Sequence, residues 1–412
     1  MPEFSIFTLG LILLTASLVA MVSRRLKLPY SVGLVIAGIV LALLPSAVEL
    51  PLTRDLIFNI FLPPLVFEAA LQLEWKAFRR DLPLTAGLAF VGVVIAAAFV
   101  TAGMHFAIGW SWIGAALFGV LITATDPVSV IAAFREMKVA RRLSMVVESE
   151  SLLNDGAAAV GFTLLATIAT GEAMTPVAIF GSLLWTVAGG VLSGVVVAGV
   201  LLFIAGRTED HLVEITLTTI AAYGSFLTAE HFHMSGVLAS LAAGLLVGNA
   251  GWMRAISEGG RSHVLAFWEY VAFLANSVVF ILIGSHEAHQ PISLVTGAAA
   301  AAVVLVLAGR ALAVYPLCAL FARTRVKIDY RYQHVLVWGG LRGALALALA
   351  LALPGDVPER QEIIVVSFAV VAFSIFVQGL TMPWLIRRLG LQRDDNASPA
   401  ADAFRAVSRR RA

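Results

Sequence analysis

The stretch SESLLNDGAAAV, from Ser149 to Val160, places Glu150, Asn154 and Asp155 inside a segment that is otherwise apolar. With its flanks, at about 143–170, the segment is long enough to cross a membrane as one helix. A carboxylate at the centre of a bilayer costs roughly 2.5–3.5 kcal/mol on insertion scales, so such groups normally face protein or an aqueous cavity. The stretch therefore predicts a polar site enclosed by other membrane helices.

The composition places the whole chain in the membrane class. Of its 412 residues, 60% are hydrophobic and 13% are charged, and the mean hydropathy is +0.92. Soluble proteins carry about 25% charged residues. The single cysteine, Cys318, excludes an internal disulfide framework and a thiolate metal cluster. The first residues lack a basic region and a cleavage site, so we expect them to form a retained first span.

Segments of about 20 apolar residues predict an all-α polytopic membrane protein with about thirteen spans. The candidates lie near 3–22, 29–47, 53–72, 83–106, 111–134, 143–170, 175–205, 211–229, 234–250, 262–284, 291–322, 332–353 and 362–386. We expect one transmembrane domain, residues 1–390, followed by a polar, disordered cytoplasmic tail at 391–412.

The positions of Lys and Arg indicate the orientation. Of 28 such residues, 24 fall in the tail or in alternate connections, the ones after odd-numbered spans. Arg54 and Arg360 lie on the opposite side, and Arg310 and Arg342 lie inside spans. Cytoplasmic loops are enriched in basic residues. We therefore expect the N-terminus outside the cell and the C-terminus in the cytoplasm.

Two spans contain residues that interrupt a helix. Pro127 follows Asp126 in the fifth span, and Gly339, Gly340 and Gly343 surround Arg342 in the twelfth. Their spacing predicts two inverted six-helix repeats, at about 3–170 and 211–386, because paired interruptions are typical of transporter substrate sites. In the third span, Pro63 and Pro64 predict a kink before Glu68.

The ionisable residues predicted to lie inside the membrane are few, and they include charges of both signs. They are Glu68, Asp126, Glu148, Glu150, Asp155, Arg310 and Arg342. On the sixth span, four-residue spacing puts Ser151 and Asp155 on one stripe and Glu150 and Asn154 on the next. The first stripe offers oxygen ligands for a monovalent cation. For Glu150, Arg310 and Arg342 a structural ion pair is favoured, and Glu148 is expected near an entrance.

Three motifs occur in order on the fifth, sixth and twelfth spans: ATDPVSV (124–130), ESESLLNDG (148–156) and WGGLRGALAL (338–347). Together they resemble the monovalent cation/proton antiporters of the NhaP type, relatives of the animal sodium/proton exchangers. The resemblance covers essentially all of the chain except the tail. It implies a homodimer whose core domain moves against the dimerisation domain.

The resemblance also implies residue roles. The expected Na⁺ ligands are Asp155, Asp126, Thr125, Ser151 and Glu68, with Asp155 also the proton carrier and Asn154 in support. Glu150 is expected to pair with an arginine, either Arg310, in AGRALAVYP, or Arg342, in GGLRG; Arg310 is favoured.

The expected function is secondary antiport of Na⁺ or Li⁺ for H⁺ across the inner (cell) membrane, electroneutral and one for one. The absence of a GxxxxGK[ST] motif indicates that an ion gradient drives it. We expect no enzyme activity, cofactor or nucleic-acid partner. Three alternatives are a K⁺/H⁺ antiporter, an organic-anion symporter that uses Arg310 or Arg342 as a clamp, and a channel. An intramembrane hydrolase is disfavoured, since HExxH and GxSxG are missing.

Overall fold

The computed structural model describes residues 6–26, 28–43, 52–169, 175–249, 256–288 and 296–392. In chain order the helices there are α1 (Ile6–Leu26), α2 (Tyr30–Ala42), η1 (Leu56–Phe61), α3 (Leu62–Leu71), α4 (Trp75–Ala86), η2 (Gly87–Val91), α5 (Gly92–Gly103), η3 (Met104–Ile108), α6 (Trp112–Leu121), α7 (Val128–Glu136), α8 (Arg141–Ala169), α9 (Pro176–Ala205), α10 (His211–His231), α11 (Gly236–Asn249), α12 (Glu258–Glu287), α13 (Thr296–Leu320), α14 (Tyr330–Trp338), α15 (Ala344–Leu351), α16 (Arg360–Phe373), η6 (Ser374–Gly379) and α17 (Leu380–Arg388). The η segments are π-helical. The part of the predicted tail from residue 393 onward lies outside the described residues.

The all-helical fold class predicted from the sequence is confirmed. In the described ranges, seven helices are long and apolar enough to cross a membrane. Four shorter apolar helices lie at Tyr30–Ala42, Leu56–Leu71, Trp112–Leu121 and Gly236–Asn249. Each range predicted as a span contains helix. The number of thirteen spans and the inverted repeat stay predictions.

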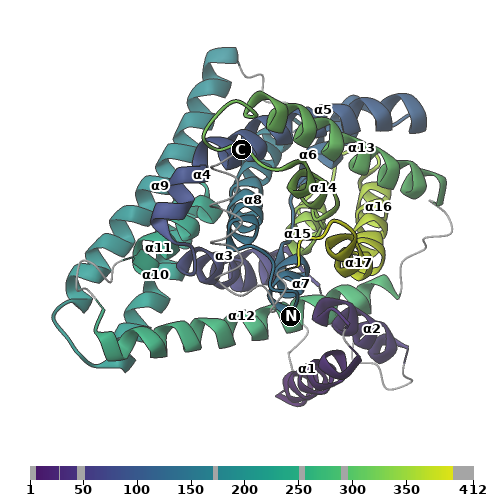
Figure 1. Ribbon diagram of the computed structural model, residues 1–412. Helices are drawn as coiled ribbons and strands as arrows, with labels where there is room; N and C mark the ends of the chain where they lie inside the picture. Colours follow the sequence, from purple (N-terminus) through teal and green to yellow (C-terminus); the bar gives the residue numbers. More distant parts are fainter. Residues whose placement is uncertain are drawn as a thin grey trace, which may run out of the picture.

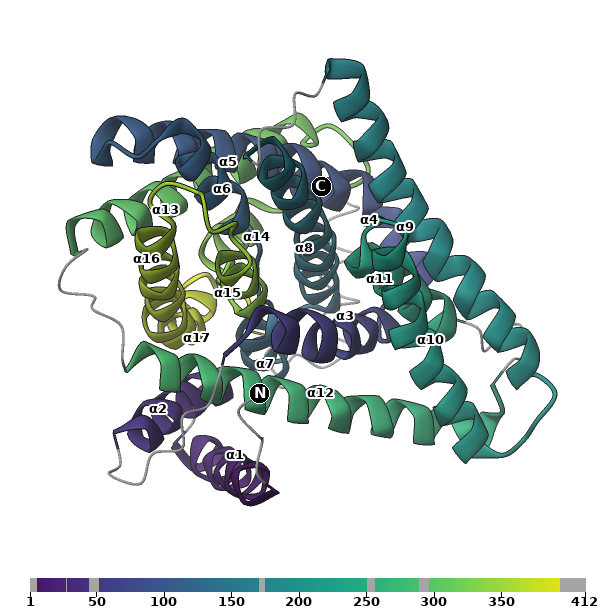
Figure 2. The same cartoon turned by 180° about the vertical axis from the view of Figure 1, so that it is seen from behind.

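Helix α8 runs through the middle of the molecule (Figure 1). On one side of it lie α9, α10 and α11, and on the other lie α13 to α17. The long helix α12 passes along one edge and joins these regions, with α1 and α2 packed outside it, as the view from behind also shows (Figure 2). The motif SESLLNDG is therefore held at the centre of the bundle.

Helix α12 is fixed to α2 by backbone contact at two glycines. A Cβ atom added at Gly284 would lie 2.1 Å from the carbonyl oxygen of Val35, and one added at Gly38 would lie 2.2 Å from that of Ile281. Small residues allow such close approach between membrane helices, where packing replaces the hydrophobic effect as the source of association. The contact gives α12 a firm position beside the centre of the protein.

The third predicted span continues through its two prolines instead of breaking. The π-helical segment η1 ends at Phe61, and α3 begins immediately, with Pro63 and Pro64 in its first turn. Proline is tolerated in the first turn because the missing N–H groups would have no intrahelical partner there. The wider π-helical turn marks the local change predicted as a kink, and α3 then carries Glu68.

We predict that Gly284→Leu lowers stability by about 2 kcal/mol or more, because the added side chain meets backbone that cannot move aside. The measurement is the melting temperature of the purified protein in detergent. The matched control is Gly199→Leu on α9, since no atom lies within 4 Å of a Cβ added there. Equal melting temperatures for the two variants would contradict the packing role of Gly284.

Candidate functional site

Two interrupted helices meet beside α8. Helix gives way to irregular backbone between α6 and α7, at 122–127, and between α14 and α15, at 339–343. The backbone N–H of Asp126 donates to the carbonyl of Leu341 at 2.7 Å, and Arg342 Nη1 donates to the carbonyl of Thr123 at 2.6 Å. Irregular backbone at membrane depth persists only where protein or a cavity satisfies it. Here each break supplies partners for the other.

Polar side chains of α8 hold the first break in place. Asn154 Nδ2 donates to the carbonyl of Thr123 at 2.8 Å and to Thr125 Oγ1 at 3.0 Å. Ser151 Oγ donates to the carbonyl of Thr125 at 2.8 Å, and its hydroxyl lies 2.7 Å from that of Thr125. Ser151 and Asn154 are both buried. The two stripes read from the sequence thus converge on one peptide segment.

The two aspartates face each other across this break. Asp155 Oδ1 accepts from the backbone N–H of Thr125 at 3.1 Å. Asp126 Oδ1 accepts from the N–H of Val128 at 2.9 Å, at the start of α7, where a helix end favours negative charge. A Cβ atom added at Gly343 would lie 2.4 Å from Cβ of Asp126, so only glycine leaves room for that side chain. Backbone N–H groups therefore orient both carboxylates.

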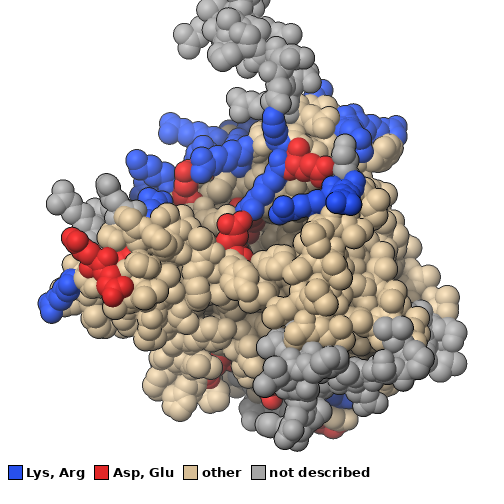
Figure 3. Space-filling view, turned by 90° about the horizontal axis from the view of Figure 1, so that it is seen from below, with Lys and Arg blue, Asp and Glu red and all other residues tan. Residues whose placement is uncertain are grey.

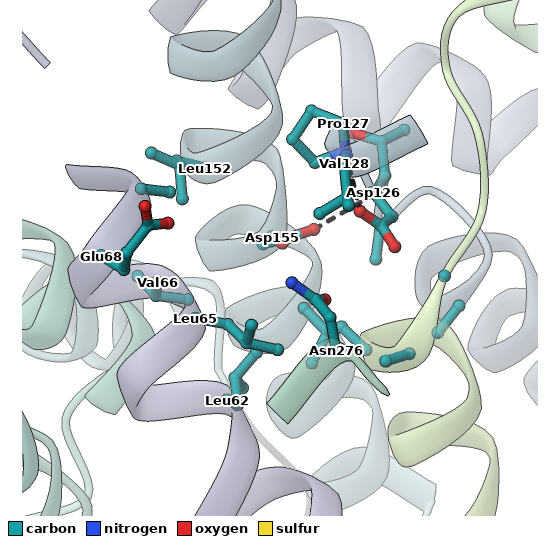
Figure 4. Close-up of a pocket in the computed structure, with 17 residues that line it drawn as sticks. Leu62, Leu65, Val66, Glu68, Asp126, Pro127, Val128, Leu152, Asp155 and Asn276 are labelled. Atoms are coloured by element: carbon teal, nitrogen blue, oxygen red, sulfur yellow. Dashed lines mark hydrogen bonds between the residues drawn. The ribbon is translucent and has the colours of Figure 1, made fainter. Parts of the chain in front are cut away.

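The carboxylates line a cavity of about 100 Å³ (Figure 4). Its polar wall consists of Glu68 from α3, Thr125 and Asp126 from the break, Asp155 from α8, and Asn276 from α12. Ser151, predicted as a ligand, lies outside this lining and bonds to Thr125 instead. Asn276 was missed by the sequence reasoning. In the sequence, Asn276 is marked only by being an amide within the apolar run FLANSVVF (273–280) of α12.

A second cavity, of about 240 Å³, adjoins the first and leads away from the aspartates. Glu148 and Glu269 line it, and so does Arg135, which donates to Gln72 Oε1 at 3.0 Å. Gln72 in turn donates to Glu68. The position of Glu148 on this approach fits the predicted entrance. Lys and Arg side chains gather at one end of the molecule, with acidic side chains beside a hollow among them (Figure 3).

The buried glutamate of α8 is paired with Arg310 of α13. Arg310 Nη1 lies 2.7 Å from Glu150 Oε1, and Nη2 lies 2.9 Å from Oε2, in a two-pronged arrangement. Arg310 Nε and Nη2 also donate to the carbonyl of Leu336. Both side chains are buried, so their charges are neutralised locally and held on three helices.

The other buried arginine has a different set of partners. Arg342 Nη1 donates to the carbonyls of Thr123 and Ala124, at 2.6 and 3.4 Å. No carboxylate among the described residues forms an ion pair with Arg342 within 4.0 Å. Of the two arginines that the sequence left open as partners of Glu150, the structure pairs Arg310.

The donor set of the site consists of oxygen atoms, with no transition-metal signature. In the parts of the chain that the structure describes, no cluster of three or more His, Cys, Asp or Glu side chains could hold a metal ion. Three carboxylates, a hydroxyl and an amide line the cavity, and oxygen donors of this kind suit a hard cation that exchanges readily.

The sequence model of a family described as "Sodium/hydrogen exchanger, transmembrane" matches residues 11–388. The chain belongs to this family. Among curated relatives of this exchanger, the Na(+)/H(+) antiporter NhaS2 of Synechocystis sp. is 37% identical, with 93% of this chain and 70% of that protein aligned. The Na(+)/H(+) antiporter ApNhaP of Aphanothece halophytica is 38% identical, with 89% of this chain and 71% of that protein aligned.

A solved structure has the same fold as this exchanger. The sodium proton antiporter MjNhaP1 from Methanocaldococcus jannaschii superposes with a TM-score of 0.74, over 93% of this chain and 98% of that chain, at 18% identity. The family predicted from the three motifs is confirmed, and so is a multi-pass membrane protein. Members of the family are transporters and not a class of enzyme.

We predict that Glu150→Ala and Arg310→Ala each destabilise the protein by about 3–5 kcal/mol, because each leaves one buried charge without a partner. The double variant should lose less stability than the sum of the single losses. Melting temperatures of the three variants in detergent test this. The matched cycle with Arg342→Ala should be additive, and additivity of the Arg310 cycle would contradict a coupled pair.

Proposed function

We propose that the protein exchanges Na⁺ for H⁺ because both ions compete for Asp155. One observation carries the proposal: Asp155 and Asp126 share a small cavity, whereas Glu150 is already neutralised by Arg310. Among the described residues, the carboxylates of this cavity have no counter-ion within ion-pair distance. A carboxylate of this kind needs either a proton or a cation to balance it in a low-dielectric interior.

Competition at one group couples the two flows. Asp155 Oδ1 is held by the N–H of Thr125, which leaves the second oxygen for a proton or a cation. The cation takes further oxygen ligands from Asp126 and Thr125, with Glu68 beside them. Ser151 and Asn154 position Thr125 and the broken backbone and do not contact the ion. Because Asp155 cannot hold a proton and a cation together, neither ion crosses without exchange.

The arginines argue against an anion substrate. Arg310 is engaged by Glu150 and Leu336, and Arg342 by backbone carbonyls. Neither lines the two cavities that lead to the aspartates. An anion clamp needs donors that are exposed to the cavity, so the organic-anion symporter is disfavoured. Both relatives are named as Na(+)/H(+) antiporters, which favours Na⁺ over K⁺ as the cation.

The placement in the membrane follows from the charges. We propose that residues 1–390 form one transmembrane domain with inverted repeats at about 3–170 and 211–386. The Lys- and Arg-rich end faces the cytoplasm of the cell, so that the N-terminus is outside. A homodimer and cofactor-free operation complete the proposal, in line with the family.

Asp155→Asn is expected to abolish exchange while the protein stays folded. Asparagine keeps the size of the side chain but cannot alternate between a proton and a cation. The measurement is Na⁺-driven pH change in proteoliposomes with a trapped dye. The control is Asp356→Asn, since Asp356 is exposed and lies away from both cavities. More than a few per cent of the wild-type rate in Asp155→Asn would refute the assignment.

Exchange is expected to be electroneutral. The residue before Asp155 is Asn154, which carries no charge to exchange at physiological pH. One carboxylate that alternates between one proton and one monovalent cation moves equal charge in both directions. The measurement is the exchange rate in proteoliposomes clamped at several voltages with K⁺ and valinomycin, where a transported net charge is worth about 2.3 kcal/mol per 100 mV. Rates that follow the voltage would show that a second carboxylate also releases its proton.

A further inference from the structure

The two cavities adjoin, and we call their junction the neck. The inner cavity, of about 100 Å³, contains the aspartates, and the outer one, of about 240 Å³, leads to Glu148 and Glu269. Residues that line both cavities form the neck, and they are Glu68, Ala69, Pro127, Val128 and Asn276. Glu68 and Asn276 supply the only polar side chains of that set. A cation that passes the neck therefore meets one carboxylate and one amide.

Asn276 lies on a helix that holds it at a fixed height beside the aspartates. The next residue, Ser277, is buried. Its hydroxyl oxygen lies 2.7 Å from the hydroxyl oxygen of Tyr30 on α2. The ring of Tyr30 stacks on Phe273, one turn away, with ring centroids 5.5 Å apart. With the close glycine contacts further along α12, these bonds fix the backbone that carries Asn276.

The side-chain amide of Asn276 differs from the other amides around the cavity in its hydrogen bonding. Among the residues that the structure describes, none forms a hydrogen bond with this side chain. The other polar amides nearby are used: Asn154 bonds to Thr123 and Thr125, and Gln72 bonds to Glu68. Figure 4 shows the Asn276 amide directed into the cavity toward Asp155. A half-buried amide without a protein partner is available to a ligand.

The same stripe of α12 extends outward from this amide. Glu269, Ala272 and Asn276 are spaced three and four residues apart, which places them on one helix face, and all three line the outer cavity. On the opposite wall, Glu68 and Gln72 are spaced four apart on α3. The path therefore has oxygen-bearing side chains on two walls, from the mouth to the aspartates.

We infer that the Asn276 side-chain oxygen is a cation ligand at this neck. This oxygen replaces one water molecule of the ion's hydration shell as the ion passes from the outer cavity to Asp155. An amide oxygen can replace part of a hydration shell, as carbonyl oxygens do in selectivity filters. Because the amide is neutral at every physiological pH, it adds affinity without altering the charge carried per cycle. This inference rests on the proposed function and identifies a further ligand for the same ion.

The location predicts an effect on one side of the membrane only. Asn276 lies between the aspartates and the Lys- and Arg-rich end, so ions arriving from that end meet it before Asp155. Ions from the opposite side reach Asp155 without crossing the neck. Loss of the oxygen should therefore raise KM for Na⁺ offered at the basic face and leave KM at the other face nearly unchanged.

The test compares Asn276→Leu, which keeps the size but removes the oxygen, with Asn276→Gln, which keeps a neutral amide oxygen. Na⁺/H⁺ exchange is measured in everted and right-side-out membrane vesicles. For Asn276→Leu we expect KM at the basic face to rise about tenfold, which is the effect of losing one hydrogen-bond-like contact to a charge. Asn276→Gln should raise KM by much less than Asn276→Leu. Asn59→Leu is the control, since Asn59 is exposed on η1 and outside both cavities.

Three results would overturn the inference. They are an unchanged KM in Asn276→Leu, an equal rise at both faces, and a fall in kcat and melting temperature without a change in KM, which a structural role would give. In each case wild-type exchange and the loss in Asp155→Asn would leave the proposed function intact. A wild-type protein without Na⁺/H⁺ exchange would instead overturn the proposed function.

Discussion

Backbone polar groups at mid-membrane must find partners inside the protein, because hydrocarbon supplies none. The crossing of the two interrupted helices is where this constraint is most severe. The N–H of Asp126 bonds to Leu341, and the carbonyl of Thr123 accepts from both Asn154 and Arg342. These bonds join α8 and both breaks into one unit. The position of each carboxylate in the cavity depends on that unit, since Thr125 and Val128 donate the N–H groups that orient Asp155 and Asp126.

The buried charges divide into two kinds. Glu150 and Arg310 neutralise each other with two short hydrogen bonds, and removal of either partner is costly. Arg342 is held by carbonyl dipoles, so its positive charge stabilises the broken backbone. Asp155 and Asp126 line the cavity, and within the described ranges their hydrogen-bond donors are backbone N–H groups. The same helix, α8, thus carries a fixed charge at position 150 and, in our proposal, an exchangeable charge at position 155.

The outer cavity that leads to the aspartates has polar side chains on two walls. Glu68 receives a bond from Gln72, which Arg135 holds in turn, so the α3 wall is tied to the basic end of the molecule. The α12 wall carries Asn276 with no partner among the described residues. With the inferred ligand role of Asn276, the site includes a helix that lies outside the three sequence motifs. Ion affinity then differs between the two sides of the membrane while the charge per cycle stays the same.

The sequence by itself determined the membrane class, the approximate ranges of the apolar helices, the two interruptions and the three carboxylates that line the cavity. These features are local: an apolar run, a proline after an aspartate or a pair of glycines has the same physical meaning in any fold. The four-residue spacing on α8 also placed Ser151 with Asp155 and Glu150 with Asn154.

The tertiary structure decided which of these groups contact one another. The sequence left two arginines open as partners of Glu150 and favoured Arg310. The contact with Arg310 depends on where the packing against α5 and α14 places α13. Ser151 has a hydroxyl that could bind a cation, yet Ser151 does not line the cavity. Its hydroxyl is hydrogen-bonded to Thr125, which does. Asn276 is far from every motif along the chain, and only the packing of α12 beside α2 and α3 brings it to the cavity of the aspartates. Spacing along a helix fixes which face a side chain occupies, but which face meets the cavity depends on contacts between helices that are distant in sequence.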